Sequence, residues 1–192
     1  LVVTPCISPW AYETVNRWNR KAIDPNRSFI SNSPAEESAA LMAMVKALNT
    51  DIHVHIDLHE TTDTDNSEFR PALSARDNVY HEFWEIPDGF YLVGDTENSC
   101  DDFQSHIIEA VSDVTHIAPS DPEGRIIGEL STQHGVINYA TEALGLCTGF
   151  SQARFNTTTE VYPDSPIVDE ENCILAQVTA ICSALDFAIE HY

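Results

Sequence analysis

The sequence predicts an α/β domain, in which a β-sheet is covered by helices. An Ala-, Leu- and Met-rich helix expected over residues 34–48 comes directly before a strand over 52–60. A Thr-rich strand over 155–162 likewise comes before a long amphipathic helix over 169–191. Helices that alternate with strands in this way are typical of α/β layering. With 192 residues, 43% of them hydrophobic, the chain can form one core, and we expect a single domain over 1–192.

The first two elements are a strand and a helix. The apolar residues at the start of the chain predict a short buried strand over 1–4. Because the chain begins inside this pattern, we expect that an N-terminal part precedes it. Ser33 followed by Pro34 is typical of a helix start. The helix over 34–48 is apolar on most sides, so we expect it to be largely buried.

The strand over 52–60, IHVHIDLHE, is the most informative stretch of the chain. It alternates strictly, and successive side chains of a strand point to opposite faces. One face is apolar, and the other carries His53, His55, Asp57 and His59. A strand that delivers histidine and carboxylate groups to the start of a polar loop is a natural place for an active site.

The later elements complete the predicted layers. We expect helices over 103–115 and 137–146, and a strand over 155–162 that carries Glu160. The final helix over 169–191 should pack on the sheet through large apolar side chains that recur every three or four residues: Ile174, Val178, Ile181, Leu185 and Ile189.

The composition excludes some partners. With 31 acidic and nine basic residues, the net charge is −22. Nucleic acids and anionic membranes need a cationic surface, so we expect neither as a partner. The five cysteines form no CxxC pair, and no basic segment precedes an apolar one as in a signal peptide. These features favour a reducing, cytoplasmic location.

The basic residues gather in one loop. Four of the nine lie between positions 17 and 27: Arg17, Arg20, Lys21 and Arg27. In so acidic a chain the cluster predicts either a site for an anion or a set of salt bridges to surrounding carboxylates. Arginine suits both uses, and the pattern alone leaves both open.

Three segments together resemble the zinc carboxypeptidases, including their aspartoacylase-like relatives. They are the loop 16–29, which contains Ile-Asp-Pro-Asn-Arg-Ser-Phe, the strand end Asp57-Leu58-His59-Glu60, and the strand segment Thr158-Thr159-Glu160. The resemblance covers about residues 1–165. It implies a mixed central β-sheet with helices on both faces, in the phosphorylase/hydrolase-like manner, and a zinc metallocarboxypeptidase activity on an amide bond next to a carboxylate.

The resemblance also implies catalytic roles for particular residues. His59 would be a ligand of Zn²⁺, and Glu160 would be the general base that activates a metal-bound water and protonates the leaving amine. Arg20 would stabilise the oxyanion, with Arg17 as the second choice.

Substrate contacts and supporting residues follow in the same way. Asn26 and Arg27 would bind the carboxylate of a peptide or N-acyl amino acid. Asp24 would orient another zinc-bound histidine, and Asp57 would support His59. For a residue that clamps the substrate, Tyr139 and Tyr162 are candidates.

The remaining zinc ligands of the family come from a His-x-x-Glu motif ahead of the basic loop. No such motif lies upstream of residue 17, and His106-x-x-Glu109 lies on the wrong side of His59 in chain order. We therefore expect the motif in the part that precedes the chain.

Two alternatives remain. A metal-free relative could bind carboxylates or peptides, or serve a structural role, and loss of the upstream ligands would favour it. An amidohydrolase-type metal hydrolase could use His53 and His55 as a His-x-His pair. Residues two apart in a strand are about 6.6–7 Å apart, and a barrel needs a longer chain, so this alternative is the weaker one.

Overall fold

The structure, a computed structural model, describes residues 1–191 and is built on a six-stranded mixed sheet. The strands are β1 (Val54–Glu60), β2 (Tyr91–Asp95), β3 (Arg125–Ile126), β4 (Glu129–Gln133), β5 (Val136–Tyr139) and β6 (Phe155–Val161). Their order is β1-β6-β2-β5-β4-β3. The pairs β1/β6 and β2/β5 are parallel and the other pairs are antiparallel, so the predicted mixed α/β sheet is confirmed.

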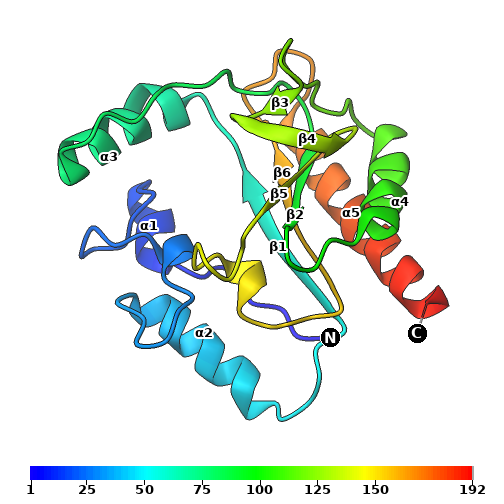
Figure 1. Cartoon of the computed structure of the whole chain (residues 1–192), viewed down its shortest axis with the longest axis horizontal. Coiled ribbons are helices and arrows are strands. Elements are labelled where there is room, and N and C mark those ends of the chain that lie inside the picture. Colours follow the sequence, from blue (N-terminus) through cyan, green and yellow to red (C-terminus); the bar gives the residue numbers. More distant parts are fainter. Residues whose placement is uncertain (192) are drawn as a thin grey trace.

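Helices lie on both sides of this sheet (Figure 1). Two long helices, α4 (Asp101–Ser112) and α5 (Glu170–Glu190), pack on one face. On the other side lie α1 (Pro9–Thr14), α2 (Glu36–Ala47) and α3 (Arg70–Asp77). Three short turns of helix complete the structure: η1 (Pro25–Arg27), η2 (Asp65–Phe69) and η3 (Cys147–Gly149).

Three aromatic rings hold α4 and α5 to the sheet. The ring centroid of Phe103 in α4 lies 5.2 Å from that of Phe155 in β6 and 5.6 Å from that of Phe187 in α5. Phe155 and Phe187 meet edge to face at 5.5 Å. Such pairs contribute about 0.5–1.5 kcal/mol beyond the area that they bury. They therefore fix β6, the strand that carries Glu160, against the helical layer.

The final helix packs through a different face from the one that we predicted. Its fully buried residues are small, with Ala176, Ala180 and Ala184 at 0% exposure. Three of the five large side chains expected in the core are exposed instead, with Ile174, Val178 and Ile189 at 64%, 48% and 74%, and Ile181 and Leu185 are half-buried. Small side chains allow the helix backbone to approach both the sheet and α4 closely. By length and composition alone α5 is long and apolar enough to cross a membrane. A helix in the core of a folded domain meets the same two criteria.

Two predictions at the N-terminal side were wrong. Residues 1–4 form no strand, and Leu1 and Val3 are exposed. The predicted helix over 34–48 is confirmed as α2, but it begins at Glu36 after Ala35 and is not capped by Ser33. Only Ser38 and Leu41 in it are buried. The reason is that α2 packs on the η1 segment and not directly on the sheet.

The prediction of a helix over 137–146 was also wrong. Its first residues belong to β5, where β-branched Val136 and Ile137 are fully buried between β2 and β4. A turn follows, in which the Thr141 hydroxyl donates a hydrogen bond to the buried Asp95 carboxylate. The strands predicted over 52–60 and 155–162 are confirmed as β1 and β6.

The packing of α5 predicts a difference between two substitutions. Ala184→Leu places three extra carbons where the helix meets the sheet, so it should destabilise the domain by about 1–3 kcal/mol. Ile174→Ala, on the outward face, should change the free energy of unfolding by less than about 0.5 kcal/mol. Urea denaturation measures both. The reverse order of the two effects would contradict this orientation of α5.

Candidate functional site

A cavity of about 660 Å³ lies at the carboxyl ends of the parallel strands β1 and β6. Much of its wall comes from three regions far apart in sequence: the basic loop, the ends of β1 and β6, and the η2–α3 segment. Tyr91 of β2 and Tyr139 of β5 also line it. The polar groups that line it include Arg17, Asp24, Asn26, Arg27, His59, Asp65, Arg70, Arg76, Tyr139 and Glu160. The carboxyl edge of parallel strands is where open α/β sheets usually bind their ligands.

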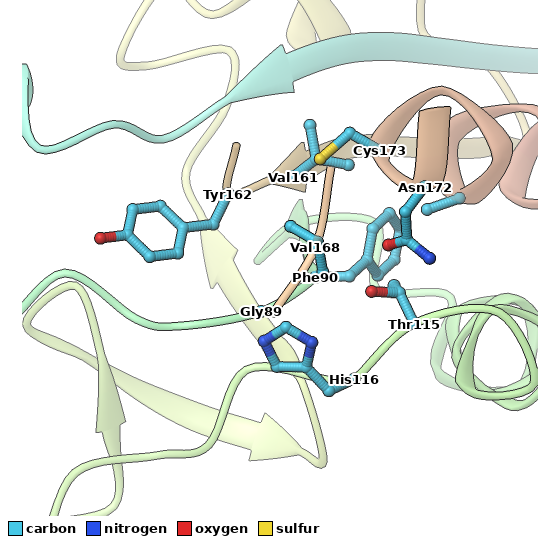
Figure 2. Close-up of a pocket in the computed structure, with 10 residues that line it drawn as sticks. Gly89, Phe90, Thr115, His116, Val161, Tyr162, Val168, Asn172 and Cys173 are labelled. Carbon is cyan, nitrogen blue, oxygen red and sulfur yellow. The ribbon is translucent and has the colours of Figure 1, made fainter. Parts of the chain in front are cut away.

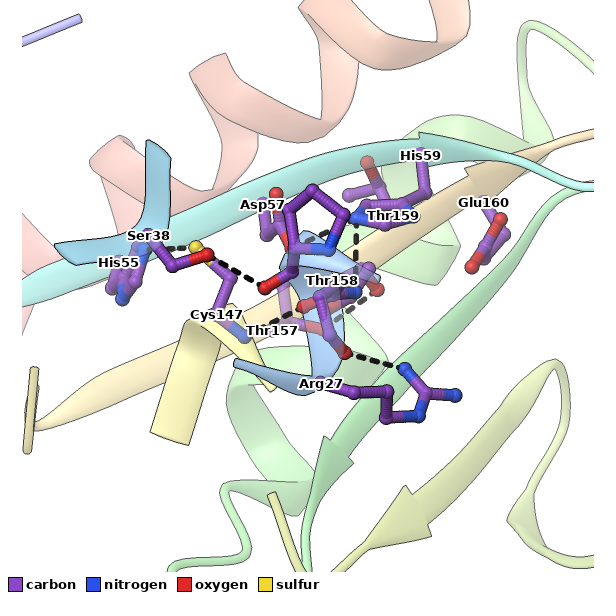
Figure 3. Close-up of polar contacts among 12 residues, drawn as sticks. Arg27, Ser38, His55, Asp57, His59, Cys147, Thr157, Thr158, Thr159 and Glu160 are labelled. Atoms are coloured by element: carbon purple, nitrogen blue, oxygen red, sulfur yellow. Dashed lines mark hydrogen bonds and ion pairs between the residues drawn. The ribbon is translucent and has the colours of Figure 1, made fainter. Parts of the chain in front are cut away.

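The pairing of β1 with β6 brings His59 opposite Glu160 (Figure 3). Burial raises the pKa of the Glu160 carboxyl to about 7, and the neighbouring His59 opposes this shift. The Thr61 hydroxyl donates a 3.1 Å hydrogen bond to Glu160 and shares another of 2.7 Å with the phenol of Tyr91. A carboxyl group that titrates near neutral pH can act as a general base.

His59 has a carboxylate partner from its own strand. Its Nε2 lies 2.9 Å from Oδ2 of Asp57, so the predicted contact between these residues is present. Burial acts to lower the pKa of His59, but the charge and hydrogen bond of Asp57 outweigh it and raise the pKa to about 9. The Asn26 amide nitrogen lies 3.3 Å from the same Nε2. Asn26 is held there because its Oδ1 accepts a hydrogen bond from the Cys147 N–H.

The described residues do not by themselves fit a zinc ion. A catalytic zinc usually takes three protein ligands and keeps one position open. Residues 1–191 contain no group of three His, Cys, Asp or Glu side chains that could hold a metal. His59 faces the cavity, but its Nε2 is engaged by Asp57, and no second histidine accompanies it there.

Of the two arginines considered for the oxyanion, the structure brings only Arg17 into the cavity. The Arg17 guanidinium pairs with Asp65 at 3.0 Å and with Asp24 at 3.7 Å. Arg20 lies outside, where its side chain is 65% exposed and pairs with Glu36 at 3.8 Å. The two positions are only three residues apart in an irregular loop, so the sequence could not decide between them.

Asn26 and Arg27, the predicted carboxylate-binding residues, both line the cavity. Asp24 organises them, because its Oδ1 accepts a 2.9 Å hydrogen bond from the Asn26 N–H and begins the η1 turn. Arg27 donates to the backbone carbonyl of Asn26 at 2.6 Å. Burial lowers the pKa of Arg27 from its ordinary value, as expected for a charged group that is withdrawn from water.

Two arginines that we did not predict as site residues, Arg70 and Arg76, also line the cavity. Arg70 stacks over Trp84, with its guanidinium carbon 4.2 Å from the ring centroid. Arg76 forms two hydrogen bonds to Asp77, of 2.7 and 3.1 Å. Their proximity in sequence to the polar loop after His59 was the only available signal.

The two tyrosine candidates lie in different places. Tyr139 lines the cavity, and burial raises its pKa to about 12. Tyr162 donates a 2.8 Å hydrogen bond to Asp63 and borders a second hollow, from which its ring points away (Figure 2). That hollow, of about 10 Å³, has room for no more than one water molecule. Of these two candidates, only Tyr139 lines the large cavity.

His55 is tied to groups outside the cavity. Its Nδ1 lies 2.8 Å from the Ser151 hydroxyl, and its Nε2 lies 3.7 Å from the Cys147 sulfur. Both contacts connect β1 to the η3 region. The geometry of His55 is that of a structural residue, and it does not favour a His-x-His metal pair.

Comparison with known proteins yields a similar structure but no family. No protein-family model and no curated protein sequence matches the chain. One similar solved structure is that of a "putative metallopeptidase" from Shewanella denitrificans OS217, with a TM-score of 0.66 and 16% sequence identity. The match covers 96% of this chain, which spans 60% of that protein's length. At this identity the similarity shows a shared α/β fold.

Proposed function

We propose that the protein is a hydrolase of the metallocarboxypeptidase type, which cleaves an amide bond next to a carboxylate. The observation that carries the proposal is that Glu160, Arg17 and Arg27 line one cavity at the ends of β1 and β6. A general base, a cation for a developing oxyanion and a cation for a substrate carboxylate are the groups that such a reaction needs. The Shewanella denitrificans protein, which shares the fold, is described as a metallopeptidase, and this description agrees with the proposal.

In the proposed reaction Arg27 and Asn26 bind the carboxylate of a peptide or N-acyl amino acid. This contact places the adjacent amide carbonyl over the strand ends. Glu160 takes a proton from the attacking water and delivers it to the leaving amine. Arg17 stabilises the negative charge that develops on the carbonyl oxygen. The ion pair with Asp65 already orients the Arg17 guanidinium.

Zinc is the metal that we propose, on the strength of the resemblance and of the histidine at the end of β1. His59 would be its ligand within residues 1–191, and the remaining ligands would have to come from another segment or chain. Metal analysis of the purified protein, with and without added Zn²⁺, tests this part of the proposal separately from the reaction.

The second candidate function is carboxylate or peptide binding without hydrolysis. The contact of Asp57 with His59 Nε2 favours it, because it occupies a ring nitrogen that a metal could otherwise take. In that function Arg27 and Asn26 would still bind a carboxylate. The two functions differ in whether the protein turns over an amide substrate.

Substitution of Glu160 distinguishes these functions. Glu160→Gln should lower kcat by about 10²–10⁴-fold, because it removes the general base. Glu109→Gln, which makes the same change on an exposed part of α4, should leave kcat unchanged. Hydrolysis of a panel of N-acyl amino acids and short peptides, with Zn²⁺ added, measures the effect.

Full activity of Glu160→Gln would contradict the role of this residue. Carboxylate binding by the unaltered protein without turnover of any substrate in the panel would support the binding function instead.

The arginine placement yields a second kinetic prediction. Arg17→Gln should lower kcat/KM by about 10²–10³-fold, because an oxyanion contact is lost. Arg20→Gln should have little effect, because Arg20 is exposed and paired with Glu36. Steady-state kinetics of the two variants measure the difference. If only Arg20→Gln lowered kcat/KM, Arg20 would be the residue that stabilises the oxyanion, as the resemblance implies.

A further inference from the structure

Strand β1 lies at one end of the sheet, and its outer edge is open. Within residues 1–191, β6 is the one strand that pairs with β1. The carbonyl of His53 accepts a hydrogen bond from the Phe155 N–H. The Thr61 N–H donates to the Val161 carbonyl, so the odd-numbered residues of β1 face β6. The even-numbered residues therefore direct their N–H and C=O groups toward the open edge: Val54, Ile56, Leu58 and Glu60. Such an edge can pair with another strand.

Helix α5 covers the sheet beside this edge and has an apolar outer face. Four large apolar residues recur along it at intervals of four, three and four residues: Ile174, Val178, Ile181 and Leu185. The first two are 64% and 48% exposed, and the other two are half-buried. This spacing is the one with which two helices pack along a shared seam. These four residues, the outer stripe of α5, thus form a helix-packing surface that residues 1–191 leave partly open to solvent.

The open edge and the outer stripe lie close enough together to be covered by one partner. Gln177 of α5 donates a 2.9 Å hydrogen bond to the His59 carbonyl of β1 and accepts one from the Thr159 hydroxyl of β6. The helix therefore lies above the gap between β1 and β6, on one face of the sheet (Figure 1). Val54 and Ile56 of β1 pack beneath it.

The spacing of these elements suits a second copy of the chain. Adjacent strands are about 4.8 Å apart. If β1 paired with β1 of a second copy across a two-fold axis, the two α5 helices would each lie about 5 Å from that axis. Their axes would then be about 10 Å apart, and packed helices are about 8–10 Å apart. Strand pairing and helix packing can therefore form in the same complex.

The sequence of β1 favours one antiparallel register. A two-fold axis at Ile56 sets this residue opposite itself and sets Val54 opposite Leu58, so that apolar side chains meet on the α5 side. In each of these pairs the two residues exchange two backbone hydrogen bonds. A two-fold axis at Asp57 would instead set two carboxylates opposite each other, which is destabilising.

We propose that the chain forms a two-fold symmetric dimer, in which β1 pairs with β1 of a second copy and the two α5 helices pack along their outer stripes. The contact is about 23 Å long, the length of the seven-residue strand, and about 20 Å deep, the thickness of a strand layer and a helix. A total of about 900 Å² over both copies is typical of a weak, reversible dimer. The inference does not depend on the proposed hydrolase function.

The charge of the chain determines how this dimer responds to salt. Each copy carries a net charge of −22, and Glu60 and Glu171 place carboxylates next to the contact. Repulsion between the copies is screened by added salt, whereas burial of the apolar stripe is not weakened by it. The dimer should therefore become more stable as the ionic strength rises, and a complex held by salt bridges would become less stable.

Sedimentation equilibrium of the purified chain measures the dissociation constant. We expect about 10–100 µM in about 0.5 M NaCl, and at least about 5-fold weaker association in about 0.05 M NaCl. Val178→Glu should weaken the dimer by about 50-fold or more, because it places a carboxylate within the stripe. Leu58→Lys should have a similar effect, since a lysine on an edge strand opposes pairing.

Met44→Glu is the matched control for Val178→Glu. It makes a change from an apolar residue to glutamate at a 38% exposed position of α2, on the other side of the sheet. The dissociation constant should stay within about 2-fold of that of the unaltered chain. Urea denaturation shows whether each variant is folded. An equal effect of Met44→Glu and Val178→Glu would overturn the proposal.

Amide hydrogen exchange locates the contact on β1. Protection of the Ile56 and Leu58 amides should rise with protein concentration, because their N–H groups become paired only in the dimer. The Asp57 amide, which faces β6 in every copy, should show the same protection at all concentrations. A dimer without this change at Ile56 and Leu58 would overturn the proposal. So would a chain that stays monomeric, including one that binds neutral phosphatidylcholine vesicles through α5 instead.

Cys182 gives an independent test of the α5 contact. Phe187 of α5 packs on Phe155, and Gln177 contacts Thr159, so the middle of this stretch lies above Ile56 and the two-fold axis. The exposed Cys182 thiols of the two copies are then near each other. A short bis-maleimide should join two chains.

This cross-linked product should be lost in Cys182→Ser. It should persist in Cys6→Ser, which removes another exposed thiol outside the contact. Cross-linking that depends on Cys6 and not on Cys182 would contradict the proposed dimer. Because neither this experiment nor the sedimentation measurement uses a substrate, failure of the hydrolase function would leave their outcome unchanged.

Discussion

The candidate site depends on the parallel pairing of β1 with β6. Seven residue pairs are in register between the two strands, and the sixth of them places His59 beside Glu160, 101 residues later. The pairing continues past the strands, where the Thr61 N–H donates to the carbonyl of Val161. A slip of one residue would turn every side chain of β1 to the other face of the sheet. The aromatic packing of Phe155 against α4 and α5 holds β6 in place.

The basic loop is attached to this framework by a small number of polar contacts. Asn26 accepts from the Cys147 backbone, and the Ser38 hydroxyl of α2 donates to the carbonyl of Pro25. Arg17 pairs with Asp65 at the start of η2, and both residues line the cavity. The loop is therefore both part of the cavity wall and the source of much of its positive charge. Of the two interpretations that the sequence left open, internal salt bridges are present at Arg17, whereas Arg27 has no such partner within residues 1–191 and the anion site stays a prediction.

Periodicity predicted the layers of the fold well, because strands and helices impose repeats of about 2 and 3.6 residues on their apolar positions. It could not predict which face of α5 is buried, since the alanines that pack on the sheet contribute little to an apolar pattern. It also failed for 137–146, where pairing with β2 decides the structure.

For the site, local motifs identified His59, Glu160, Asn26 and Arg27, which the structure places in one cavity. Arg70 and the choice of Arg17 over Arg20 depend on how distant loops meet, which no local pattern contains.

The most direct test is a crystal structure of the Glu160→Gln variant with an uncleaved N-acyl amino acid. We expect the substrate carboxylate to lie within about 3 Å of Arg27 and Asn26 nitrogens. We also expect the amide carbonyl to point toward Arg17, above the ends of β1 and β6. A ligand bound outside this cavity, or one whose carboxylate avoids Arg27, would contradict it.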